Sequence, residues 1–373
     1  MLATERAGTH SGGMASLLSR RSDTPRMIDT ARPGWLAWWL VIVAALVVTI
    51  VAVGGITRLT ESGLSITQWD PVTGVLPPLS EQAWQAEFAR YRATPEYRLE
   101  AGPAGMTLSD FKGIFFWEWF HRLLGRLIGM VFALPLIFAW VRGWIPRGYK
   151  PRLVALLALG GLQGVFGWLM VRSGLGDDMT DVSHFWLSIH LGTALITLAG
   201  LVWTALDLRT LKRDPRARPA RLLPFAALAG IVLFMQVVLG AWVAGLNAGL
   251  ASNTWPLMQG RFLPEANWSQ GAFWAFTHDP FLLHFLHRWF AWIAFAALVW
   301  LGLQASRRDG NTGKALLALV CAQVLLGIVT VVTGVSIWMA VAHQVTGALL
   351  VAATAASAHA LGQRTSRMEG LAA

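Results

Sequence analysis

Four of the nine histidines stand inside long apolar segments, and they carry the clearest chemical signal in the chain. They are His121, His190, His287 and His343. Ionisable groups within a membrane are rare and usually functional. One neutral imidazole on each of two facing helices can bind a single porphyrin iron. The four positions therefore predict two haem sites. For any one of these histidines the alternative is a buried hydrogen bond between helices.

A carboxylate accompanies only one of these histidine positions. Glu118 stands three residues before His121, so the two side chains share a helix face, whereas the matching residue before His287 is His284. A carboxylate at membrane depth is costly. We interpret this asymmetry as a site that performs chemistry beside a site that carries electrons. The structural alternative is that Glu118 only pairs with Arg122 or bonds to a ligand histidine.

Three arginines lie close to the histidines: Arg122, Arg126 and Arg288. Guanidinium matches carboxylate geometry, so these side chains are candidates for contacts with haem propionates. The alternative is that they extend to the membrane surface and are solvated there. His184 lies near the start of its apolar segment and could face the first site. The roles of His184 and His284 stay open at this stage.

Eight membrane-spanning helices are predicted to position these residues. The chain has 373 residues, 55% hydrophobic and 13% charged, with a mean hydropathy of +0.52, which argues against a soluble enzyme. A helix needs about 20 apolar residues to cross a bilayer. The final stretch runs 49 residues without a charge and must hold two helices that turn near 334–338. The apolar stretches are 33–57, 127–141 (the inner half of the second helix), 153–171, 182–206, 222–246, 281–303 and 315–363.

The sequence also contains an internal duplication. Residues 63–69 align with 249–255 at an offset of 186, and Gly54 with Gly240 keeps the same offset. We therefore predict an all-α membrane protein built from two parallel four-helix bundles. The repeats are 35–208 and 222–362, joined by a basic linker at 209–221, with tails at 1–34 and 363–373. Gln–Gly pairs at 163/167, 236/240 and 323/327 are interpreted as helix packing with one interhelical hydrogen bond.

The distribution of charge predicts the orientation. Of the 30 basic residues, 20 fall in the segments that share one side of the membrane with both termini. The positive-inside rule places that side in the cytoplasm. It also explains the net charge of +10 without a nucleic-acid partner. We expect a multi-pass protein of a bacterial inner membrane with a disordered cytoplasmic tail at 1–34. The alternative is the mitochondrial inner membrane, with that tail as a presequence.

Several motifs resemble the haem A synthase family, over about Trp35 to Ala360. The 94–97 loop resembles the branch shared by alphaproteobacteria and mitochondria. Some bacterial relatives carry cysteine pairs in their outer loops. This chain has only Cys321, so a reaction step that depends on such a cysteine pair does not apply to it. The motifs are Gly55-Ile56-Thr57-Arg58-Leu59-Thr60, Ser62-Gly63-Leu64-Ser65, Glu87-Phe88 with Tyr91, Thr94-Pro95-Glu96-Tyr97, Phe111-Lys112-Gly113-Ile114-Phe115, Glu118-Trp119-Phe120-His121-Arg122 and Asn253-Thr254-Trp255-Pro256-Leu257-Met258.

This resemblance implies oxidation of the C8 methyl group of haem O to a formyl group, giving haem A for cytochrome c oxidase. It places the substrate haem O between His121 and His190, and a resident haem b between His287 and His343. Glu118 matches an acidic residue needed for the chemistry. The implied partners are haem O synthase, cytochrome c oxidase assembly factors and an unidentified electron acceptor.

Two other function classes stay open from the residues alone. One is a di-haem b-type cytochrome that only transfers electrons, for which a carboxylate at a single haem has no evident use. The other is a transporter that uses the histidines and Glu118 as a proton relay. The sequence does not give the electron acceptor, the source of oxygen or the oligomeric state.

Overall fold

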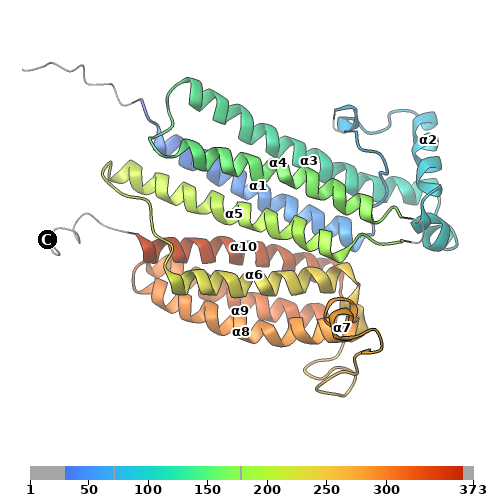
Figure 1. The fold of residues 1–373 in the computed structure, drawn as a ribbon. Coiled ribbons are helices and arrows are strands. Elements are labelled where there is room, and N and C mark those ends of the chain that lie inside the picture. Colours follow the sequence, from blue (N-terminus) through green and yellow to red (C-terminus); the bar gives the residue numbers. More distant parts are fainter. Residues whose placement is uncertain (1–29, 71, 177–178, 364–373) are drawn as a thin grey trace, which may run out of the picture.

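The computed structural model describes residues 30–70, 72–176 and 179–363, and within them the chain is helical without a β-strand (Figure 1). The predicted tails fall largely on 1–29 and 364–373, outside the described residues. Eight helices of the described part are long and apolar enough to cross a membrane, which confirms the predicted all-α, eight-span protein. They are α1 (Pro33–Leu59), α3 (Leu108–Val141), α4 (Lys150–Ser173), α5 (His184–Arg213), α6 (Pro224–Gly245), α8 (Pro280–Ser306), α9 (Gly310–Val332) and α10 (Ile337–Gly362).

The long uncharged stretch near the C-terminus divides where the sequence predicts a turn. Helix α9 ends at Val332 and α10 begins at Ile337. Between them, Gly334 has φ +64° and Val335 has φ +61°. Glycine adopts this left-handed conformation without steric cost, so it permits the reversal that a run of ordinary residues would resist. The two crossings are therefore an antiparallel pair joined by a short connection.

Helix starts carry residues that satisfy the free backbone N–H groups. The Asp279 carboxylate accepts the N–H of Leu282 at 2.7 Å, and Pro280 occupies the first turn of α8. At α9 the Asp309 carboxylate accepts bonds from the Thr312 hydroxyl and from backbone N–H groups, and these bonds lower the pKa of Asp309. The cap of α8 lies eight residues before His287 and fixes where that helix begins.

The spanning helices form two layers (Figure 1). In one layer α1 packs against α3 and α5, and α4 packs against α5. In the other, α6 contacts α8, α8 contacts α9, and α9 contacts α10. Helix α10 also touches α1 and α5, and α6 touches α5, so the layers share an interface. The further interpretation of these layers as two copies of one unit stays a prediction.

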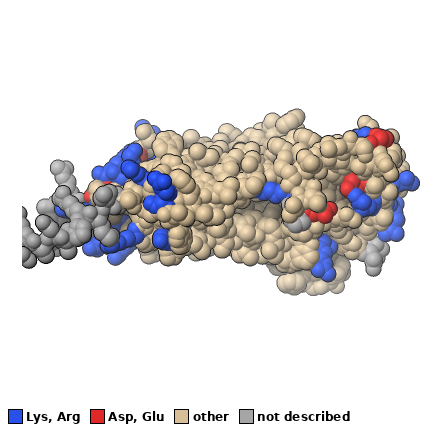
Figure 2. All heavy atoms as spheres, turned by 90° about the horizontal axis from the view of Figure 1, so that it is seen from above, with Lys and Arg blue, Asp and Glu red and all other residues tan. Residues whose placement is uncertain are grey.

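The surface has the charge pattern expected of a membrane protein. Figure 2 shows a broad belt without Lys, Arg, Asp or Glu along the molecule, with charged side chains gathered towards its two ends. Large apolar side chains stand exposed along the helices, among them Leu134, Leu228 and Leu325, each more than 60% exposed. A water-soluble protein seldom leaves so extended an apolar surface uncovered. This belt therefore fits a position within lipid.

Short elements gather at one end of the molecule, which we call the loop end. They are η1 (Thr73–Val75), α2 (Glu81–Arg92), η2 (Tyr97–Ala101), η3 (Ala248–Ala251) and α7 (Ala272–His278). Helix α2 begins after Ser80, whose hydroxyl accepts the N–H of Ala83 at 3.2 Å. It packs against the first turns of α3 through Phe88, Tyr91, Phe111 and Phe115. Since α3 has 34 residues and is about 50 Å long, its first turns extend beyond a bilayer core.

The opposite end, the tail end, has a buried ionic contact. Asp207 of α5 is fully buried and accepts bonds from Arg152 of α4 at 2.5 Å and from His359 of α10 at 2.9 Å. The backbone N–H of Ala220, in the predicted linker, also donates to Asp207 at 2.9 Å. Helix α5 itself continues to Arg213, so its last turn includes the first residues of that linker. One carboxylate thus ties the linker to helices of both layers.

Candidate histidine sites

Each of the four histidine rings lies against a glycine of the preceding spanning helix. A Cβ atom added to that glycine would stand 2.8–3.3 Å from the Cε1 atom of the ring, closer than ordinary van der Waals contact. Small residues at helix contacts let side chains or backbones approach closely. These glycines therefore provide the room in which the imidazoles enter the helix bundle. The pairs are Gly54 with His121, Gly167 with His190, Gly240 with His287 and Gly327 with His343.

The second histidine pair has a spacing suited to one metal. The ring centroids of His287 and His343 are 6.5 Å apart, and the ring planes stand at 88° to each other. A metal–imidazole bond is about 2 Å long, so two rings on opposite sides of one metal have centroids roughly 6 Å apart. The observed separation of 6.5 Å is close to this distance, so the two rings can share one metal. The donor set also fits haem iron, which commonly takes imidazole as an axial ligand.

The first histidine pair is likewise partly buried in the helix bundle. His121 on α3 and His190 on α5 interact electrostatically. The Nδ1 atom of His121 is buried and has no hydrogen-bond partner among the described residues. In the same described part, no group of three or more His, Cys, Asp or Glu converges as a conventional metal cluster would require. Pairs of imidazoles are thus the ligand sets that the helices offer here, and they suit a porphyrin iron, which needs only axial ligands from protein.

Glutamines one turn before these glycines contact the histidines. Gln236 lies with its Nε2 atom 3.1 Å from His287 Nδ1 and donates to the His287 carbonyl at 3.0 Å. Gln323 Nε2 lies 3.3 Å from His343 Nε2. Gln163, with its amide oriented to satisfy its neighbours, lies 3.2 Å from His190 Nδ1. The Gln–Gly pairs thus form the predicted interhelical hydrogen bonds. The partner in each bond is one of the candidate ligand histidines, which the sequence did not predict.

The first half lacks this glutamine beside His121. At the offset of 186 residues, Gln236 corresponds to Ile50 of α1. An aliphatic side chain cannot accept or donate a hydrogen bond, which accounts for the unpartnered Nδ1 of His121. The two sites therefore share the glycine contact. They differ in which ring lacks a partner at Nδ1 within the described residues, His121 in the first site and His343 in the second.

Glu118 is buried and fully bonded. It is 3% exposed, and its Oε2 atom accepts bonds from the Ser65 hydroxyl at 2.7 Å and the Ile66 N–H at 2.6 Å. Its Oε1 atom forms an ion pair with Arg122. The pairing with Arg122 that the sequence offered as a structural alternative is therefore present. A catalytic role for Glu118 stays a prediction.

Two arginines form hydrogen bonds to corresponding loops in the two halves. Arg122 donates to the carbonyls of Ile66 at 2.7 Å and Gln68 at 2.9 Å. Arg288 donates to the corresponding carbonyls, of Ser252 at 2.7 Å and Thr254 at 2.8 Å. Both arginines thus hold the loop that follows the first helix of their half. Their contact with haem propionates, predicted from the sequence, stays a prediction.

The remaining predicted residues take separate positions. Arg126 donates to the Asp70 carbonyl at 2.7 Å, again in the loop after α1. His284 accepts a bond from Arg288 Nε at 3.0 Å, so it occupies the place that Glu118 has beside Arg122. His184 packs against His278 of α7, with ring centroids 4.9 Å apart. His184 thus joins α5 to α7 in a contact that the sequence analysis had not foreseen.

A membrane protein with two pairs of imidazoles buried in a helical bundle is the class that this fold and these sites define. Residues 37–355 match the model of the COX15-CtaA family, described as cytochrome oxidase assembly protein. The match spans most of the chain, so the protein belongs to this family.

Similar proteins from alphaproteobacteria carry a more specific name. A heme A synthase of Erythrobacter litoralis is 63% identical, over 88% of this chain and 97% of that protein. A heme A synthase of Sphingopyxis alaskensis is 58% identical, over 91% of this chain and 95% of that protein. One from Novosphingobium aromaticivorans is 55% identical, over 88% and 95%.

Proposed function

We propose that this protein is a haem A synthase, which oxidises the C8 methyl group of haem O to a formyl group. Relatives of that name, 55–63% identical over nearly their whole length, support the proposal. The observation that carries it is the buried Glu118 beside only one of two imidazole pairs. Oxidation of a methyl group releases protons as well as electrons, so a carboxylate at the substrate has a use there that it lacks in an electron relay.

In this proposal one histidine pair binds the substrate and the other binds a cofactor. Substrate haem O binds between His121 and His190, and a resident haem b binds between His287 and His343. The position of Glu118 supports this assignment. The ring contacts differ between matching histidines: Gln236 lies against His287 Nδ1, whereas His121 Nδ1 has no partner among the described residues. On the other two helices the order is reversed, because Gln163 lies against His190 Nδ1 and His343 Nδ1 has no partner in the described part. Glu118 then lies in the substrate half.

The side chains around Glu118 suit a base in an apolar setting. Arg122, the Ser65 hydroxyl and the Ile66 N–H together hold its carboxyl group in place. The carboxylate accepts a proton from the methyl group as that group is oxidised. The surrounding helices exclude bulk water from the reacting carbon. A haem b in the second half would supply one-electron transfer.

The membrane setting and the partners follow from the same proposal. The protein lies in the bacterial inner membrane with the tail end and both termini in the cytoplasm. Basic side chains at the tail end support this orientation, among them Arg142, Arg147, Lys150 and Arg209. Haem O synthase supplies the substrate, cytochrome c oxidase assembly factors take the product, and an electron acceptor completes the cycle.

The test is to co-express the protein with haem O synthase, purify it and identify the haems that it releases. We expect haem b together with haem O or haem A. Haem b alone would instead favour a di-haem cytochrome that only transfers electrons. In such a protein Glu118 would have a structural role, through its bonds to Ser65, Ile66 and Arg122. A protein that binds no haem would contradict both.

A further inference from the structure

A second buried carboxyl group lies at the loop end. Glu96, in the connection between α2 and η2, is 6% exposed, and its Oε2 atom has no hydrogen-bond partner among the described residues. The hydroxyl of Tyr91, a fully buried side chain of α2, lies next to this carboxyl group. Buried polar atoms are normally bonded. A carboxyl oxygen left free in such a place therefore calls for a functional explanation.

The neighbours of Glu96 link it to the proposed active site. Glu118 of α3, Glu61 after α1 and Glu100 of η2 act on it electrostatically, in addition to Tyr91. Burial first, and then these negative charges, raise the pKa of Glu96 to about 8. A carboxyl group of this kind takes up and releases a proton near neutral pH.

Glu118 needs a neighbouring proton acceptor if it is to act as a base more than once. Its carboxylate is 3% exposed, and its oxygens are occupied by Ser65, Ile66 and Arg122. A proton taken from the substrate methyl group must leave Glu118 before a second can be accepted. The loop end is the near side of the membrane for this transfer, because Glu118 lies in the first third of α3.

We propose that Glu96 receives the proton from Glu118 and passes it to the solution at the loop end. This inference rests on the proposed function. In the transfer the O–H bond of Glu118 breaks and an O–H bond forms on Glu96, which restores the Glu118 carboxylate. Glu96 then gives its proton to water. No electron moves in either step.

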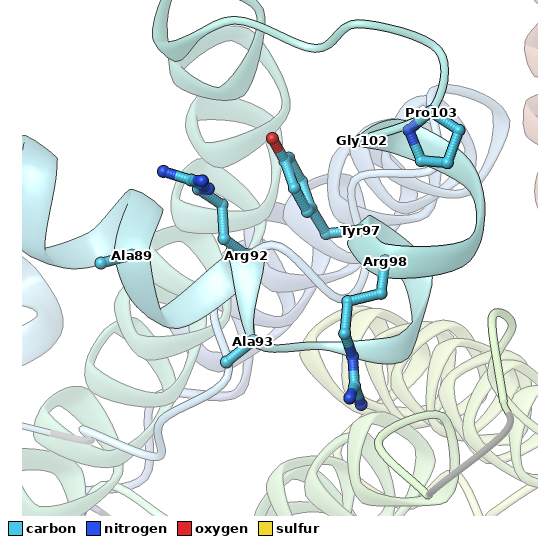
Figure 3. A pocket seen from close by; sticks show the side chains of 7 residues that line it. All are labelled: Ala89, Arg92, Ala93, Tyr97, Arg98, Gly102 and Pro103. Atoms are coloured by element: carbon cyan, nitrogen blue, oxygen red, sulfur yellow. The ribbon is translucent and has the colours of Figure 1, made fainter.

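In this proposal the proton leaves through the pocket next to the segment that carries Glu96. The pocket is open, has a volume of about 600 Å³, and is lined partly by Tyr97 and Arg98, the residues that follow Glu96 in the chain. Figure 3 shows the Tyr97 ring beside Arg92 at the pocket, with Arg98 extending away from the ring. Water in the pocket therefore reaches the segment that carries Glu96, while the carboxyl group itself stays buried.

The experiment compares Glu96→Gln with Glu265→Gln, the same change at an exposed position whose carboxylate pairs with Arg261. Haem A formation is followed as a function of pH in the full-length protein. Glu96→Gln should slow it at least about tenfold and remove the inflection near pH 8, with haem O still bound. Tyr91→Phe, which keeps the ring packing, should displace that inflection. Glu96→Asp should restore part of the rate.

A second measurement does not depend on turnover. Infrared titration of the wild-type protein should show a protonated carboxyl band that disappears near pH 8, and this band should be absent from Glu96→Gln but present in Glu265→Gln. Equal rates and pH profiles for the two variants would overturn the relay alone, as would a band that persists in Glu96→Gln. A wild-type protein that makes no haem A would overturn the proposed function, and the relay with it.

Discussion

The two histidine sites are built alike and differ in single positions. Both place their rings against glycine, and both have an arginine that binds two carbonyls of the preceding loop. Beside that arginine stands Glu118 in the first half and His284 in the second. Gln236 contacts the His287 ring in the second half, and the corresponding position in the first half is Ile50.

This comparison teaches that the scaffold and the chemistry are separable. The shared contacts bring two imidazoles together in the helix bundle, which is what any haem requires of the protein. The differing positions decide whether a carboxylate is at hand and how firmly the ligand ring is oriented. In our proposal the first site is therefore the reactive, exchangeable one and the second the fixed one.

The largest effect is expected from Glu118→Gln. This change keeps the shape of the side chain and removes its capacity to accept a proton, so haem A formation should fall at least about 100-fold. Haem O should accumulate in the purified protein, because both imidazoles of the first site remain. The haem content after extraction and the rate of conversion are the measurements.

A matched exposed acid, Glu265→Gln, serves as the control for this change. The haem b spectrum of the second site checks that the Glu118 variant still folds. If Glu118→Gln converted haem O at the rate of the control, Glu118 would be a structural residue that fastens the loop through Ser65 and Ile66, and the chemical difference between the halves would have to lie elsewhere.

A smaller effect is expected where a glycine supports a ring. Gly240→Ala places a Cβ atom 2.8 Å from His287 Cε1, so the ring must move. Overpacking of this kind costs roughly 2 kcal/mol, which corresponds to about 30-fold weaker retention of haem b. Gly230→Ala in the same helix meets no atom within 4 Å and is the control. Equal haem retention in the two variants would show that the glycine contact does not govern ligand position.

Much of the fold could be predicted because membrane crossing imposes simple rules. Uncharged length, basic connections and the glycine at 334 sufficed to place eight helices and the turn between the last two. The candidate ligands were also evident, since ionisable residues at such depth stand out against apolar surroundings.

The contacts between helices could not be predicted in the same way. Gln236 and Gly240 were recognised as a spaced pair, yet which side chain of another helix they meet depends on helix rotation and tilt, which apolar composition leaves undetermined. The same holds for Glu118, whose partners Ser65 and Ile66 lie more than 50 residues away in an irregular loop. The sequence does not show that the loop with Ser65 and Ile66 folds back onto the Glu118 carboxylate.

The smallest expected effect comes from exchanging the residues behind the rings. Gln236→Ile should free His287 Nδ1 and weaken haem b retention about threefold, the equivalent of a net hydrogen-bond contribution of roughly 0.7 kcal/mol. Ile50→Gln should have the opposite effect at His121, slowing product release, because an amide then faces the unpartnered Nδ1. Haem dissociation to an acceptor protein measures both changes. If the two substitutions shifted dissociation in the same direction, or left it unchanged, then the contact behind the ring would not be what separates an exchangeable site from a permanent one.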